Sequence, residues 1–92
     1  MSQTITERVI YTGRVQGVGF RYSVRALARQ FPVKGYVKNL PDGSVELVVQ
    51  GAAEVINGLL AAVAGHFEGN IHHCERRVIE PAESFSMFEI RF

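Results

Sequence analysis

The feature that most limits the fold of this chain is the alternation of strand-like and helix-like segments within only 92 residues. Two segments carry apolar side chains at intervals of three or four residues, which places those side chains on one face of a helix. The first set is Phe20, Val24, Leu27, Ala28 and Phe31, and the second is Val55, Ile56, Leu59, Leu60, Val63 and Phe67. We expect the first helix to stop at Pro32 and the second near Gly65 or His66.

The other regular segments are typical of strands, because they are rich in β-branched and aromatic residues or alternate between apolar and polar ones. They span residues 8–12, 36–40, 45–50, 70–79 and 87–92. Between the second and third lies Pro41-Asp42-Gly43-Ser44, whose residue types favour a tight turn, so these two strands should form a hairpin.

This order predicts an α+β fold, the ferredoxin-like α/β sandwich with βαββαβ order and a short terminal strand. Both helices should cover one face of an antiparallel sheet. The length suits a single domain over residues 1–92. Because folds of this kind host enzymes, metal carriers, regulators and RNA-binding modules, the function has to be argued from a site.

Composition and charge exclude several classes of protein. A chain that is 47% hydrophobic and 21% charged is neither disordered nor collagen-like, and a net charge of +1 argues against a protein built to grip nucleic-acid backbones. A single cysteine, Cys74, rules out a disulfide within the chain. With no signal-like N-terminus and no apolar run long enough to span a bilayer, we expect a cytoplasmic monomer with no membrane or nucleic-acid partner.

The segment between the first strand and the first helix carries a candidate anion site. Three glycines, Gly13, Gly17 and Gly19, allow backbone N–H groups to converge at the start of a helix, and Arg21 adds a guanidinium there. Spacing alone also fits an ordinary tight turn beside a solvated arginine. The dinucleotide fingerprint is incomplete, because Tyr22 stands where its third glycine should be.

The full string Val15-Gln16-Gly17-Val18-Gly19-Phe20-Arg21, preceded by Gly13, closely resembles the phosphate-binding loop of the acylphosphatase family. A second string at the expected distance also resembles the family: Gly35-Tyr36-Val37-Lys38-Asn39, then Gly43-Ser44-Val45 and Gly51. The resemblance implies the fold described above. It also implies an acylphosphatase, a hydrolase that splits the carboxyl–phosphate bond of acyl phosphates such as acetyl phosphate.

By match to those strings, the resemblance implies a role for particular residues. Arg21 takes the place of the phosphate-binding arginine and Asn39 that of the asparagine that positions the attacking water. Backbone N–H groups complete the phosphate site, and they belong to Gln16, Gly17, Val18, Gly19, Phe20 and Arg21. The family needs no metal and no cofactor. The leaving group is a carboxylate, so the reaction needs no general acid and a phosphate oxygen can accept the proton of the water.

Some residues outside these strings have a second interpretation. His66, His72, His73 and Cys74 could suggest a metal site, but their spacing matches no standard finger, and neighbours in a strand point to opposite faces. We expect no metal site and a buried Cys74 thiol. Phe20 and Tyr22 should pack in the core or support the loop rather than stack on a substrate.

Three other functions remain as alternatives. An RNA-binding module lacks the aromatic residues that this role would need on the third strand. A domain that binds a carbamoyl or acyl phosphate for another enzyme, as in hydrogenase maturation factors, begins a longer chain, whereas here nothing follows Phe92 and we expect a free-standing enzyme. A ligand-sensing regulatory domain would dimerise through a sheet edge. The sequence does not select one acyl phosphate as the substrate.

Overall fold

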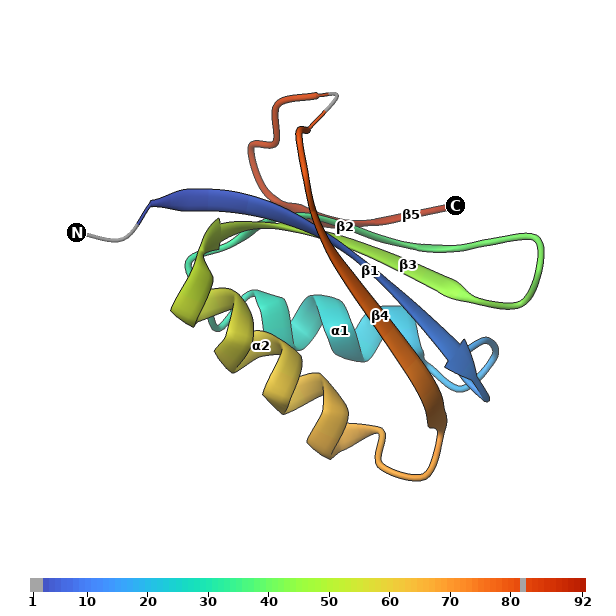
Figure 1. The fold of residues 1–92 in the computed structure, drawn as a ribbon. Helices are drawn as coiled ribbons and strands as arrows, with labels where there is room; N and C mark the ends of the chain where they lie inside the picture. The colour runs from blue at the N-terminus through green and yellow to red at the C-terminus, as the bar shows by residue number, and fades with distance from the viewer. Residues whose placement is uncertain (1–2, 82) are drawn as a thin grey trace.

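The computed structural model describes residues 3–81 and 83–92 of the chain. These residues form a five-stranded sheet with two helices on one of its faces (Figure 1). The elements in chain order are β1 (Thr4–Gly13), α1 (Phe20–Ala28), β2 (Lys34–Asn39), β3 (Val45–Ala52), α2 (Ala53–His66), β4 (Ile71–Ile79) and β5 (Phe88–Arg91). The predicted ferredoxin-like α+β fold is therefore confirmed. Neither helix is long and apolar enough to cross a membrane.

The strands lie in the order β4-β1-β3-β2-β5. The predicted antiparallel pairing holds for β1 with β3, β1 with β4, and β2 with β3. The short terminal strand differs, because β5 pairs with β2 in parallel at the opposite edge from β4. The chain has to pass from one edge of the sheet to the other between β4 and β5, which no hairpin connection could achieve.

The register of β3 aligns the ends of its two neighbours. Val45, at the start of β3, is paired with Tyr11 of β1 on one side and with Asn39 of β2 on the other. Because β1 and β2 both run antiparallel to β3, both strands end beside the start of β3, at the same end of the sheet. The loop that follows β1 and the turn that follows β2 are consequently neighbours.

The core lies between the helices and the face of the sheet that they cover. Alternate strand residues point into it, as the period of two for β-strands requires. Its fully buried members include Val9, Phe20, Val24, Val37, Leu47, Val49, Ile56, Leu59 and Val63. Phe20 lies here with 1% of its surface exposed, which confirms the prediction that its ring packs in the core.

The first helix is shorter than its apolar pattern predicts, because it ends at Ala28 and not beside Pro32. The N–H groups of Gln30 and Phe31 donate to carbonyls three residues back, so the chain tightens into turns before Pro32, whose ring disfavours helix in the preceding residue. Phe31 still packs against the core from this turn. The pattern thus identified the buried face correctly and placed the helix end too late.

The helices do not cover the sheet evenly. α1 packs against β2 and β5, and α2 packs against β3, so the β4 edge extends beyond the helix layer. Cys74 of β4 is exposed for this reason, and the prediction of a buried thiol is wrong. An edge strand beyond the helices keeps solvent on both of its faces, whatever its sequence pattern suggests.

One glycine in β2 is required by the close approach of β3. Gly35 has φ +138°, and a Cβ there would collide with the carbonyl group of Val48. We expect Gly35→Ala to lower the free energy of unfolding by at least about 2 kcal/mol in urea denaturation, from backbone strain together with this collision. Gly65→Ala is the matched control in α2, because a Cβ there meets nothing within 4 Å, and it should stabilise by ~0.5–1 kcal/mol. Equal stability of the two variants would contradict this account.

Candidate active site

The loop between β1 and α1 is held at two points by hydrogen bonds. At its start, the Arg14 N–H donates to the Asn70 carbonyl over 2.8 Å, and Asn70 Nδ2 donates back to the Arg14 carbonyl over 3.1 Å. Further along, Gln16 Nε2 donates to the carbonyls of Leu40 and Ser44, each over 2.9 Å. The Gln16 side chain therefore fastens the loop to the turn that follows β2.

The turn after β2 is formed by the residues that the sequence predicted. The Asp42 carboxylate accepts a hydrogen bond from the Ser44 hydroxyl and another, over 2.9 Å, from the Ser44 N–H. These two donors hold the pKa of Asp42 below its ordinary value. A turn ordered in this way gives Gln16 a fixed pair of acceptors.

Two glycines set the path of the loop. Gly17 and Gly19 have φ +75° and +77°, in the left-handed region that favours glycine, and Gly19 is the N-cap of α1. Within the described chain, the N–H groups of residues 15–19 donate to no other backbone group. The first N–H groups of α1 likewise lack acceptors inside the helix, so this end of the helix favours an anion.

Arg21 lies in the first turn of α1 and is oriented by the C-terminal strand. Its Nη1 donates to the Arg91 carbonyl over 3.1 Å, and its guanidinium carbon lies 4.7 Å from the centre of the Phe92 ring. In the described part of the chain no carboxylate pairs with Arg21, and its other N–H donors have no protein acceptor. The guanidinium is therefore held in place with its charge uncompensated.

Asn39 is the last residue of β2 and lies on the same face of the sheet as the buried Val37. Its Oδ1 atom is buried and accepts no hydrogen bond from any described residue. A buried acceptor without a donor is uncommon and costs about 1–3 kcal/mol. Asn39 therefore has an acceptor available for a group that enters from outside the chain.

These residues line one cleft of about 160 Å³. Of the residues predicted for the site, Gly17, Gly19, Phe20, Arg21 and Asn39 line it. Gln16 and Val18 do not: Gln16 fastens the loop, and Val18 lies 40% exposed beside it.

Two residues of the cleft were not assigned to the site from the sequence, Val15 and Tyr22. Val15 is a buried residue of the loop. Tyr22 was expected to pack in the core or support the loop. Packing in the core is wrong, because Tyr22 is 58% exposed and lines the cleft, with the Arg25 guanidinium 5.4 Å from the centre of its ring. Tyr22 follows Arg21 directly on a helix that starts at the cleft, a position that could have indicated its place.

The histidines lie away from this cleft, since none of His66, His72 and His73 is among its lining residues. Among residues 3–81 and 83–92, no group of three or more His, Cys, Asp or Glu side chains is placed to hold a metal ion. Among the residues that line the cleft, Arg21 is thus the charged one. The polar groups that could contact a ligand are backbone N–H groups and the Asn39 amide.

The strand that carries Asn39 is braced on the opposite face of the sheet. The Tyr36 hydroxyl donates to Glu46 over 2.8 Å, and Arg8 Nε donates to the same carboxylate over 2.6 Å. Burial, with a smaller contribution from the hydrogen bond to Glu46, raises the pKa of Tyr36 to about 12. This network connects β2, β3 and β1 and takes no part in the cleft.

Removing the Gln16 amide should loosen the loop. We expect Gln16→Met to lower the free energy of unfolding by about 1–2 kcal/mol in urea denaturation, because two hydrogen bonds are lost while the side-chain volume is kept. Gln30→Met is the matched control, since Gln30 is exposed after α1, and it should change stability by less than about 0.5 kcal/mol. No difference between the two variants would show that the Gln16 bonds contribute nothing.

The comparisons with known proteins agree on one family. The acylphosphatase family model matches residues 7–90. The chain is similar to an acylphosphatase of Anaeromyxobacter dehalogenans, 39% identical over 93 residues that cover 100% of both chains. It is also similar to the crystal structure of an acylphosphatase from Bacillus subtilis, with 32% identity and a TM-score of 0.86 over 98% of this chain and 100% of that one.

A further solved structure, full-length HypF in a phosphate- and nucleotide-bound form, is 25% identical with a TM-score of 0.84. That match covers 100% of this chain and 12% of the HypF chain. The same fold therefore also occurs as one part of a much longer protein. With a family match over residues 7–90 and a relative aligned from end to end, the chain belongs to the acylphosphatase family.

Proposed function

We propose that the chain hydrolyses the carboxyl–phosphate bond of small acyl phosphates, such as acetyl phosphate, to a carboxylate and inorganic phosphate, without a metal or cofactor. The observation that carries the proposal is the meeting of Arg21, the glycine loop and Asn39 in one cleft of about 160 Å³. A cleft of this size suits a phosphoryl group with a short acyl chain.

The phosphoryl group would be held by the loop and Arg21. The N–H groups of residues 16–21 lie at a helix start, where unpaired donors and the helix dipole favour a negative charge. One nitrogen of the Arg21 guanidinium, Nη1, donates to the Arg91 carbonyl. The remaining N–H donors would bond to two phosphate oxygens. In phosphoryl transfer the equatorial oxygens carry the charge of the transition state, so these donors stabilise it.

The attacking water would be placed by Asn39. Its buried Oδ1, which has no donor in the described structure, would accept a hydrogen bond from the water and hold the water oxygen toward phosphorus. The water oxygen then forms a bond to phosphorus while the bond from phosphorus to the carboxylate oxygen breaks. A phosphate oxygen accepts the proton of the water, and the carboxylate leaves without one, because it is a weak base.

The first test measures the two proposed catalytic residues. With benzoyl phosphate as substrate in chelator-treated buffer, we expect Arg21→Ala to lose at least ~10²-fold in kcat, the loss typical of one removed transition-state donor. Asn39→Ala should lose at least ~10²-fold as well, because the attacking water is no longer held in position. Arg21→Lys should also fail, because an ammonium cannot form the planar two-bond contact. Phosphate release measured against time gives each rate.

Controls for these variants come from neighbouring residues. Arg25→Ala removes an arginine one turn further along α1, and Lys38→Ala changes the neighbour of Asn39 on the other face of the sheet. Both should keep activity within about threefold, since neither side chain lines the cleft. A folded Arg21→Ala or Asn39→Ala protein that retains most of its activity would refute the assigned role, and no turnover by the natural chain would refute hydrolysis.

The proposed proton route makes a separate prediction about pH. Because the phosphate oxygen accepts the proton, no histidine is needed as a base, and the three histidines lie outside the cleft. We expect His66→Ala, His72→Ala and His73→Ala to give the same dependence of kcat on pH as the natural chain. The loss of one limb of the profile in any of them would show that its imidazole takes part.

A further inference from the structure

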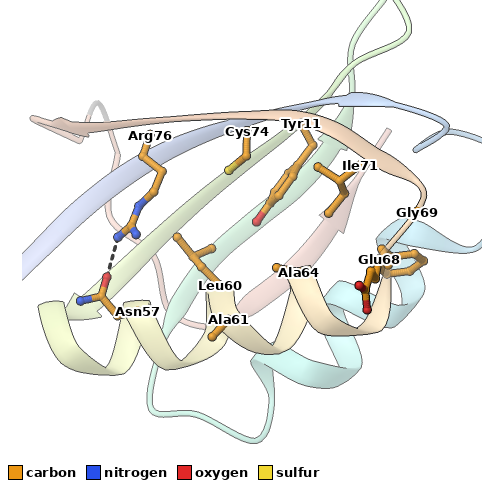
Figure 2. Close-up of a pocket in the computed structure, with 11 residues that line it drawn as sticks. Tyr11, Asn57, Leu60, Ala61, Ala64, Glu68, Gly69, Ile71, Cys74 and Arg76 are labelled. Carbon is orange, nitrogen blue, oxygen red and sulfur yellow. Dashed lines mark hydrogen bonds between the residues drawn. The ribbon is translucent and has the colours of Figure 1, made fainter.

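A second cavity lies apart from the cleft, between β4 and α2 (Figure 2). Its volume is about 480 Å³, three times that of the cleft and within the range of small-molecule sites. It exists because α2 packs over β3 and leaves the β4 edge uncovered, and because α2 presents the small side chains Ala61 and Ala64 to the gap. We call it the β4–α2 pocket.

The walls of the β4–α2 pocket are mainly apolar. They comprise Tyr11, Leu60, Ala61, Ala64, Phe67 and Ile71. Such a surface favours the apolar body of a ligand, because burying it removes hydrocarbon from water on both sides of the contact.

The pocket also contains an unused hydrogen-bond donor. Tyr11 is 2% exposed, and its hydroxyl has no hydrogen-bond partner among the described residues. Figure 2 shows this hydroxyl pointing toward α2, between Leu60 and Ala64. Burial raises the pKa of Tyr11 well above its ordinary value, so the phenol stays neutral and offers its proton to an acceptor.

The charged groups at the two ends of the pocket favour a neutral ligand. Arg76 at one end donates to both carboxylate oxygens of Glu7, each over 2.9 Å, and to Asn57 over 2.7 Å, so its charge is already compensated. Glu68 lies at the other end, where it would repel an anion, and because it is exposed, water already solvates its charge and weakens its attraction for a cation. Neither end of the pocket therefore requires a charged group on the ligand.

We propose that the β4–α2 pocket is a second binding site, for a neutral small molecule with an apolar body and one hydrogen-bond acceptor that bonds to the Tyr11 hydroxyl. This site does not depend on the proposed hydrolysis. The ligand needs an acceptor because the Tyr11 hydroxyl has no partner, and it needs an apolar body because the walls of the pocket are mainly apolar. A ligand that supplies both would satisfy a buried donor that the chain leaves without a partner.

Cys74 provides a direct way to test the site. It is paired with Tyr11 in the β1–β4 register, lines the pocket, and is the only cysteine of the chain. Its thiolate attacks the sulfur of a probe disulfide, so that a Cys74–probe disulfide forms and cysteamine leaves as the thiol. Although Cys74 is exposed as a residue, the pocket partly desolvates its thiol and so raises the pKa of Cys74, and the exchange is therefore run at mildly alkaline pH with excess 2-mercaptoethanol to establish equilibrium.

Two probes separate affinity for the pocket from simple thiol reactivity. The first is the mixed disulfide of cysteamine with N-(2-mercaptoethyl)benzamide, which has a phenyl ring and an amide carbonyl. The second replaces the benzamide by acetamide, so it keeps the carbonyl and lacks the ring. We expect the benzamide probe to occupy Cys74 with an equilibrium constant at least about tenfold larger, measured by intact mass spectrometry. Equal occupancy by the two probes would overturn the proposal.

Variants show whether the preference arises in the pocket. Tyr11→Phe should reduce benzamide occupancy roughly fivefold through the lost hydrogen bond, and Ala64→Phe should abolish the preference by filling the space. A chain with Cys74→Ser and Arg77→Cys carries its thiol on the opposite face of β4 and should show no preference. Because Ala64 is exposed, the filling variant should fold. An undiminished preference in Tyr11→Phe and Ala64→Phe, or the same preference at position 77, would contradict the site.

Discussion

The pairing of β3 with both β1 and β2 is the constraint on which the cleft depends. Val45 is in register with Tyr11 and with Asn39, so the loop after β1 and the end of β2 lie at the same end of the sheet, beside the start of β3. Gln16 then fastens this loop to the turn after β2 through two carbonyl acceptors. Asn39 and Arg21, which are far apart in sequence, become neighbours through main-chain pairing and one side-chain amide.

The order of elements and the glycine loop could be predicted from the sequence because both depend on local chemistry. Apolar spacing identified the buried faces, including that of Phe31, which packs against the core from outside the helix. The parallel pairing of β5 and the exposure of Cys74 could not be predicted in this way. Both depend on which sheet edge a strand occupies, and the residue types of a strand do not encode that choice.

The site shows the same division between local and tertiary information. The glycines and Arg21 form a recognisable group within one loop, whereas Asn39 became a candidate only through resemblance to a family, since no spacing rule connects it to Arg21. Gln16 was predicted from its backbone N–H, and the structure adds a role for its side chain that depends on the conformation of a distant turn. Tyr22 was predicted to pack in the core or support the loop, and its exposure at the cleft depends on which face α1 turns toward the sheet.

Two buried side-chain polar atoms in the described structure have no hydrogen-bond partner, Tyr11 Oη and Asn39 Oδ1. Each belongs to a residue that lines a cavity. Phe20 connects the two residues, because it lines the cleft with Asn39 and packs edge-to-face against Tyr11, with ring centres 5.2 Å apart. A folded chain leaves few such atoms unsatisfied, since each costs about 1–3 kcal/mol. The missing partner of Asn39 is a donor, as a water would be, and Tyr11 Oη needs an acceptor to take its proton. The two cavities therefore differ in the chemistry that would complete them, even though Tyr11 of one packs against Phe20 of the other.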